Sequence, residues 1–319
     1  MPRRFKRLLL LAFATASLSP VLAQVPYPQK PIRIIASSAV GGLLDAHARL
    51  YALKMSEKLG QPVTVENRPG ANGALAYSAV RGAERDGYTL LATSDTIAIR
   101  AARQRDPGYD LEKDFTGIGL FSRAPVVLLT GNGQRERNFS ELAARARTAP
   151  DTLTYASSGE GTTTHLAAAL LLQQASVRML HVPYKGNAAA KPDVIGGRVN
   201  VMLGVLQDLG AGNMRALGVS ATKRVPAYPD IPTLAEQGAA DFSWYPWFGL
   251  VAPSGVPKDV VQRLAQAMQY AAQSDDIRRY MEREGSELVA MSPEQFTASM
   301  RETRLRIERL AADLDWPKE

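Results

Sequence analysis

The sequence predicts an α/β fold in which two lobes face one another. Short apolar runs alternate with helical segments from residue 30 to residue 96, and the alternation starts again after another strand-like run, Pro125–Thr130. Each half also carries a loop rich in glycine and hydroxyl residues between a predicted strand and a predicted helix. Repeated β–α–β order is typical of parallel sheets with right-handed crossovers.

Residues 1–23 have the pattern of a secretory signal peptide. Four cationic residues precede the apolar run Leu8–Leu18, and Val21-Leu22-Ala23 offers a small-residue cleavage site before Gln24. The apolar run is about half as long as a membrane-spanning helix requires. We therefore expect cleavage near Ala23/Gln24 and a periplasmic protein.

Charge and composition exclude several classes of function. The formal net charge is +7, and removal of the four leader cations leaves +3. Lysine and arginine form no stripe with interleaved aromatic residues, so the sequence does not indicate a nucleic-acid partner. The absence of cysteine excludes disulfides, thiol nucleophiles and cysteine-bound metals.

The first loop follows a predicted strand at Ile32–Ile35. It contains Ser37, Ser38, Ala39, Val40, Gly41 and Gly42, and apolar residues then recur at helical spacing from Leu44 to Leu59. Gly60 and Pro62 end that helix. A helix N-terminus presents unpaired N–H groups and a positive dipole end, so this loop is a candidate anion site. An ordinary strand-to-helix turn is the alternative.

The remaining first-half elements complete a β–α–β–α–β order. We expect strands at 63–66 and 88–93, with a helix at 74–84 between them. Ser94 follows the last of these strands, which places a hydroxyl at the same edge of the sheet as the first loop.

The second loop, Ser158–His165, lies between a predicted strand at 153–157 and a predicted helix at 166–174. Two glycines and four hydroxyl residues accumulate there, whereas plain helix capping needs only one hydroxyl. We interpret Ser158, Gly161, Thr162 and Thr163 as a second anion site.

The later elements suggest where the lobes join. Strands are predicted at 199–203, 215–219 and 244–251, a capping box at Thr233 and Glu236, and helices in the tail beginning near 256, 274 and 292. Crossings near 122–130 and 246–252 then give one lobe from residues 24–124 and 248–319, and a second from residues 125–247.

A series of motifs along the mature chain resembles the periplasmic receptors of tripartite tricarboxylate transporters, also called Bug-type or TctC-like receptors. The matching segments in the first half are Tyr27-Pro-x-Lys-Pro-Ile-Arg33, Gly41-Gly42-x-x-Asp45, Leu59-Gly-Gln-Pro-Val63, Glu66-Asn-Arg-Pro-Gly-Ala71 and Asp86-Gly-Tyr-Thr-Leu90. Those in the second half are Tyr155-Ala-Ser-Ser-Gly-x-Gly-Thr162 with His165, His181-Val-Pro-Tyr-Lys-Gly186, Arg215-Ala-Leu217, Pro229-Asp-Ile-Pro-Thr233 and Trp247-Phe-Gly-Leu-Val-Ala-Pro253.

This resemblance implies a type II periplasmic-binding-protein fold that closes over a small organic carboxylate. It implies that residues 37–42, Ser94, Ser158, Gly161, Thr162 and Thr163 hold the ligand, and Tyr184 of the matching motif joins them. It also implies a membrane transporter as partner, no cofactor and no metal. We expect a monomer. A sensory or scaffold protein that presents its ligand to a membrane kinase is the alternative.

The chain departs from the family pattern at three places. Its first loop lacks the usual proline and aromatic residues. Pro192 lies late after the Tyr-Lys-Gly motif, so the next helix is expected to begin near Lys191. Gly204 stands where an acidic residue is common, which predicts the loss of one polar contact.

The hypothesis that the protein is an enzyme has the least support from the sequence. No G-x-S-x-G or H-E-x-x-H motif occurs, so a hydrolase or metalloenzyme lacks its usual constellation. The three histidines fall on three separate predicted elements, and His165 is interpreted as a packing residue. Asp45 is expected to stabilise its own helix N-terminus. Trp244, Tyr245 and Trp247 either line a ligand cleft or pack where the lobes cross.

Overall fold

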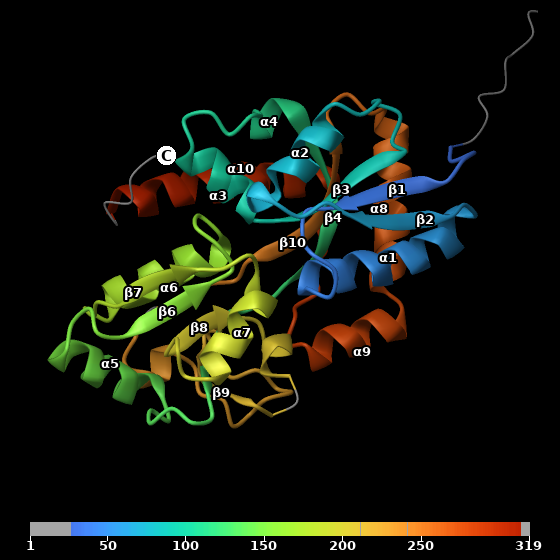
Figure 1. Ribbon diagram of the computed structural model, residues 1–319. Helices are drawn as coiled ribbons and strands as arrows, with labels where there is room; N and C mark the ends of the chain where they lie inside the picture. Colours follow the sequence, from blue (N-terminus) through green and yellow to red (C-terminus); the bar gives the residue numbers. More distant parts are fainter. Residues whose placement is uncertain (1–26, 211, 241, 314–319) are drawn as a thin grey trace, which may run out of the picture.

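Two five-stranded sheets organise the protein, and the computed structural model describes residues 27–210, 212–240 and 242–313. The predicted signal peptide lies outside the described residues. The first sheet has the order β2-β1-β3-β10-β4 and the second the order β7-β6-β8-β5-β9. Figure 1 shows the two sheets as separate bodies linked near β10.

The strands of the first sheet are β1 (Ile32–Ala36), β2 (Val63–Asn67), β3 (Thr89–Ser94), β4 (Phe115–Arg123) and β10 (Trp247–Pro253). Those of the second sheet are β5 (Val127–Gly131), β6 (Thr154–Ser157), β7 (Leu180–Pro183), β8 (Val201–Gly204) and β9 (Met214–Val219). In each sheet four strands point in the same direction, and three of them pair directly in parallel, as the β–α–β order predicts. The fifth strand, β10 in the first sheet and β5 in the second, runs antiparallel to both of its neighbours.

Helices cover both faces of each sheet (Figure 1). Around the first sheet lie α1 (Leu43–Leu59), α2 (Ala74–Arg81), α3 (Thr96–Arg103), α4 (Leu111–Asp114), α8 (Lys258–Ala272), α9 (Asp275–Arg283) and α10 (Pro293–Asp313). Around the second lie α5 (Phe139–Thr148), α6 (Thr163–Gln174) and α7 (Asn187–Ile195), and short 3₁₀ turns span Ala71–Gly73, Leu206–Leu209 and Ala235–Gln237. No helix among the described residues is both long and apolar enough to cross a membrane.

The apolar cores follow these faces. One cluster joins α1, α8 and α9 to the first sheet, and a smaller one lies between α7 and the second sheet. The largest combines buried residues of α2, α3 and α10 with residues of α5 and α6. The apolar core is therefore continuous from one sheet to the other.

Strand β4 was not predicted from the sequence, because Gly117 and Gly119 interrupt its apolar pattern and glycine disfavours strands. The structure shows what these glycines allow. A Cβ atom at Gly117 would lie 2.7 Å from the Phe296 ring, and one at Gly119 would lie 3.2 Å from Met268 Sδ. The glycines let α10 and α8 pack directly on the backbone of the strand.

The predicted start of α7 near Lys191 is wrong. The helix begins at Asn187 and contains Pro192 in its sixth position. Hydrogen bonds from the Gly186 amide to Ser158 O (3.1 Å) and from Asn187 Nδ2 to Asp208 Oδ2 (2.6 Å) hold the start of the helix. These tertiary contacts outweigh the single helical bond that the proline removes.

Candidate functional site

The first loop leaves the N-terminus of α1 without a side-chain cap. Its N-cap residue is Gly42, which has no side chain to offer. The tip of the loop is exposed, and the Val40 side chain is 73% exposed although it is apolar. Ser37 and Ser38 are half-buried beneath it, and Ser38 Oγ has no hydrogen-bond partner among the described residues. Loop tip and helix end are thus open to a ligand.

Asp45 holds this loop from below. Its carboxylate is 3% exposed and accepts hydrogen bonds from the Gly41 amide (2.9 Å), Arg49 Nε (3.0 Å) and Asn67 Nδ2 (2.8 Å). Burial alone raises the pKa of Asp45, but these three donors outweigh it and lower that pKa below its ordinary value. As expected from the sequence, Asp45 stabilises its own helix N-terminus, and it consumes the Gly41 amide in doing so.

The second loop forms a compact hydroxyl network. Thr162 is the N-cap residue of α6, yet its side chain makes no capping bond. Its hydroxyl donates to Gly159 O (2.7 Å) and meets the hydroxyls of Ser158 (3.1 Å) and Thr164 (3.3 Å). The plain-capping alternative is therefore wrong for this loop, because the hydroxyls brace the loop and leave the helix end uncapped.

The second loop contacts the first lobe between the sheets. Thr163 Oγ1 donates to Asp95 Oδ2 (2.9 Å), which lies between β3 and α3. Asn72 Nδ2 of the first lobe donates to Glu160 O of the second loop (2.5 Å), and Arg103 Nη1 lies 3.8 Å from Glu160 Oε1. Ser94, the residue before Asp95, pairs with Thr96 Oγ1 (3.1 Å). The structure thus brings the end of β3 and the start of α6 together.

The Tyr184 hydroxyl is bonded within the second lobe and not to the second loop. Its hydroxyl donates to Asp193 Oδ2 (2.6 Å) on α7, while its backbone amide donates to Ser157 O (3.1 Å). Tyr184 thus supports the second loop through its backbone, and its hydroxyl is engaged inside the second lobe.

Trp244 and Trp247 are buried where the chain passes between the sheets. Trp244 Nε1 donates to Thr163 Oγ1 (3.1 Å) and Trp247 Nε1 to Thr303 Oγ1 (3.1 Å). Trp247 also packs edge-on against Phe296, with ring centroids 5.2 Å apart. Of the two alternatives left open by the sequence, these contacts favour packing at the crossing.

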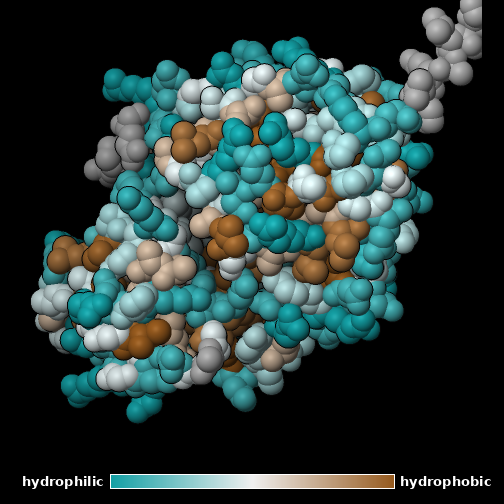
Figure 2. Space-filling view, turned by 45° about the vertical axis from the view of Figure 1, so that its right-hand side comes forward, coloured by the Kyte–Doolittle hydropathy of each residue, from teal (hydrophilic) through white to brown (hydrophobic). Residues whose placement is uncertain are grey.

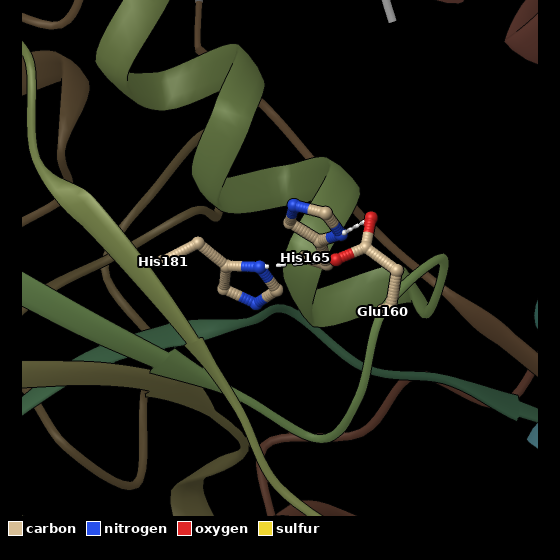
Figure 3. A group of neighbouring side chains, drawn as sticks. All are labelled: Glu160, His165 and His181. Atoms are coloured by element: carbon tan, nitrogen blue, oxygen red, sulfur yellow. Dashed lines mark ion pairs between the residues drawn. The ribbon is translucent and has the colours of Figure 1, made fainter. Parts of the chain in front are cut away.

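Glu160, His165 and His181 form a cluster that sequence reasoning missed (Figure 3). Glu160 Oε1 lies 3.2 Å from His165 Nδ1 and Oε2 lies 3.2 Å from His181 Nδ1. The interpretation of the histidines as scattered is wrong for these two, because β6 and β7 pair in parallel and bring His181 beside the start of α6. The signal available in the sequence was that His181 lies at the start of the strand that follows α6, while His165 lies in the first turn of that helix.

The geometry of this cluster does not suit a metal ion. The two imidazole rings are stacked, with centroids 3.8 Å apart and planes inclined by 11°. A metal must lie in the plane of each ligating ring at about 2.1 Å from its nitrogen, which two parallel stacked rings do not permit. The Gly161 amide also donates to His165 Nδ1 (3.1 Å), which occupies that lone pair. Burial lowers the pKa of His165 to about 3 and that of His181 to about 4, so both rings are neutral at pH 7.

The second lobe has an acidic group beside Gly204 at this edge of the sheet. Asp208 folds back over it and accepts hydrogen bonds from the Val205 amide (3.0 Å) and Asn187 Nδ2 (2.6 Å). Lys191 Nζ lies 2.9 Å from Asp208 Oδ1. A Cβ atom at position 204 would lie 2.5 Å from Asp208 Oδ2, so the glycine makes room for this carboxylate. That Gly204 removes a polar contact to a ligand stays a prediction.

Two sheets of matching strand order, with the polar second loop against the first lobe between them, define a two-lobed solute-binding protein. The model of the tripartite tricarboxylate transporter family receptor matches residues 47–315. The chain belongs to this family, and its members and structural neighbours are solute-binding receptors rather than enzymes.

Relatives and solved structures agree with this assignment. A UPF0065 protein from the tcbD-tcbE intergenic region of Pseudomonas sp. strain P51 is 37% identical over 84% of this chain and 81% of its own. Protein BugT of Bordetella pertussis is 30% identical over 88% of both chains. An R. palustris protein with adipate matches with a TM-score of 0.86 at 30% identity, covering 91% of this chain and 99% of its own. MatC from Rhodopseudomonas palustris with bound malate matches with a TM-score of 0.82 at 30% identity, covering 89% and 99%.

Proposed function

We propose that this protein captures a small organic carboxylate between its two lobes and delivers it to the membrane subunits of a tripartite tricarboxylate-type transporter. The lobes are residues 24–124 with 248–319, and residues 125–247. The main observation that supports this proposal is that α1 and α6 both begin without a side-chain cap. Each helix follows a loop at the carboxyl end of a parallel strand. Uncapped helix N-termini attract anions through their N–H groups and dipoles.

The composition of the site supports a carboxylate of modest charge. Residues 37–42, Ser94, Ser158, Gly161, Thr162 and Thr163 carry backbone amides and hydroxyls, and no lysine or arginine occurs among them. Some of these groups, such as the Gly41 and Gly161 amides, already bond within the protein and shape the two loops. Adipate and malate, held by two structural neighbours, are both small dicarboxylates, which supports the same chemical class here. Tyr184 belongs to the proposed site through its support of the second loop.

A thermal-shift screen of residues 24–319 tests the proposal. A panel of carboxylic acids is compared with the amides of the same compounds, after co-purified ligand has been removed. A ligand at 100 times its dissociation constant adds about 2.7 kcal/mol to the free energy of unfolding. A raised melting temperature with an acid and none with its amide supports carboxylate capture. The absence of a shift with every acid contradicts it.

Localisation and assembly are proposed with the function. We infer export to the periplasm with cleavage near Ala23/Gln24, and a monomeric receptor. Intact mass and light scattering of the protein released from the periplasm test these two points. Co-purification with a membrane kinase instead of transporter subunits would favour the sensory alternative.

A further inference from the structure

Asp95 is a buried acidic residue at the meeting point of the two lobes. Its side chain is 2% exposed, and Oδ2 accepts the hydroxyl of Thr163 across the lobe boundary (2.9 Å). Trp244 Nε1 points at the same Thr163 oxygen (3.1 Å). An indole N–H only donates, so the one hydroxyl proton of Thr163 is directed to Asp95, and Oδ2 must act as an acceptor.

The other carboxylate oxygen of Asp95, Oδ1, receives no hydrogen bond of this kind in the described part of the chain. Oδ1 is buried and has no hydrogen-bond partner among the described residues. Asp95 also occupies the N-cap position of α3 without capping that helix through its side chain. An ionised carboxylate that is buried with only the Thr163 hydroxyl and the Thr96 amide as donors is costly, and a proton on Oδ1 removes that cost.

The position of Asp95 makes its charge matter to a ligand. It follows Ser94 directly and contacts Thr163, and both residues belong to the proposed carboxylate site. A ligand carboxylate held there would be repelled by an ionised Asp95 but would be tolerated, or hydrogen-bonded, by a protonated one. A buried carboxylic acid that stays neutral can serve as a hydrogen-bond donor.

We propose that Asp95 is a specificity-determining residue that receives the ligand carboxylate in its protonated form, so that binding above neutral pH takes up one proton. The proton comes from the solvent and resides on Oδ1, and no covalent bond of the ligand changes. This inference rests on the proposed function, because it requires a carboxylate beside Ser94 and Thr163.

The titration range of Asp95 agrees with this role. Burial raises the pKa of Asp95 to about 7, although the hydrogen bonds from the Thr163 hydroxyl and the Thr96 amide act in the opposite direction. Burial raises the pKa of Tyr77 to about 12 and lowers that of His165 to about 3, so neither group changes charge between pH 6.5 and pH 9. The charged groups on the elements packed around Asp95 are Arg100 and Arg103 on α3, Glu160 in the second loop, and Arg306 of α10, whose guanidinium lies 5.0 Å from the Trp244 ring centroid.

Calorimetry of the mature protein with sodium adipate and sodium malate, and with any acid found in the thermal screen, provides the test. Titrations run from pH 6.5 to pH 9, and those at pH 8 use two buffers with different ionisation enthalpies. Since only the protonated fraction binds, the affinity should fall on the order of 100-fold between pH 6.5 and pH 9. The buffer dependence of the heat at pH 8 should correspond to uptake of about one proton.

The variant Asp95→Asn keeps the shape of the side chain but cannot gain or lose a proton in this pH range. Its amide supplies an N–H donor in place of the protonated oxygen, and its carbonyl still accepts from Thr163. We expect this variant to bind the acid with an affinity that changes less than about threefold over the same pH range, with no proton uptake. Asp259→Asn, an exposed acid in the first turn of α8, is the matched control and should keep the wild-type pH dependence.

The outcomes distinguish this inference from the proposed function. Binding of an acid with buffer-independent heat and constant affinity from pH 6.5 to pH 9 overturns the role of Asp95 and leaves the receptor function intact. Wild-type pH dependence in a folded Asp95→Asn protein overturns it as well, because another group then carries the proton. Failure of every acid to bind at pH 6.5 overturns the proposed function itself.

Discussion

The contacts of Asp45 show how one residue can set the conformation of the first loop of the proposed site. Its carboxylate accepts from Gly41 in the loop, from Arg49 one turn along α1, and from Asn67 at the end of β2. Asn67 Nδ2 in turn donates to Ser38 O (3.1 Å). The loop is therefore tied at both ends to one buried anion.

Replacement of Asp45 by asparagine should loosen the loop. The neutral amide cannot accept all three donors, so we expect the free energy of unfolding to fall by about 1–3 kcal/mol and the acid affinity to decrease. Denaturant unfolding and calorimetry measure the two effects. Asp259→Asn removes the same charge from the first turn of α8 and should leave both unchanged. Equal losses in the two variants would argue against a specific role for Asp45.

The stacked histidines should make the protein sensitive to mild acid. Their pKa values in the folded protein, about 3 for His165 and about 4 for His181, lie below the ordinary value of 6.5. The unfolded chain therefore binds more protons between pH 6.5 and pH 4, and stability is lost as the pH falls through this range. In His181→Asn the melting temperature should fall less steeply from pH 6.5 to pH 4 than in the wild type. Asp95 is present in both proteins, so the difference isolates the histidine; identical slopes would contradict the prediction.

At the scale of elements, the end of β8 depends on a glycine. Asp208 occupies the space over Gly204 and links the strand to the start of α7 through Asn187 and Lys191. The bond from Asn187 to Asp208 is one of the two hydrogen bonds that hold the start of α7 ahead of its proline, and the acidic group at this edge comes from position 208.

Gly204→Ala should displace Asp208. The added methyl group would lie 2.5 Å from Oδ2, so the carboxylate must move and its bonds to Val205 and Asn187 must break. We expect a loss of about 1–3 kcal/mol in the free energy of unfolding. Gly133→Ala adds the same group where nothing lies within 4 Å, and it serves as the control. A loss no larger than that of Gly133→Ala would show that Asp208 is not held in this place.

At the scale of the whole molecule, the two lobes share one continuous apolar cluster but few polar contacts. Asp95 with Thr163 and Asn72 with Glu160 connect the first lobe to the second loop, and two segments of chain pass between the sheets. Such an arrangement is typical of proteins whose lobes close around a ligand. Hydrophilic residues cover most of the face drawn in Figure 2, with apolar residues in separate small patches.

A carboxylate ligand should shift the protein toward its closed form. The ligand contacts both lobes only when they are closed, so its greater affinity for that form increases the closed population. We expect the radius of gyration from small-angle X-ray scattering to decrease on addition of a bound acid and to stay constant with its amide. Identical scattering with and without a saturating acid would contradict ligand-driven closure.

Local patterns in the sequence determined the βα units of both sheets, the two hydroxyl-rich loops and the family. The period of apolar residues and the position of turn residues are local properties, so Gly60 ends α1 in a left-handed conformation as predicted, and Thr233 with Glu236 forms both bonds of its capping box. The tertiary structure alone decided which distant groups meet. The pairing of β6 with β7 stacks His165 on His181, the packing of α10 and α8 explains the glycines of β4, and the approach of the lobes sets Asp95 against Thr163. These contacts join residues between 16 and about 180 positions apart, and their energies depend on burial and geometry that no local sequence window contains.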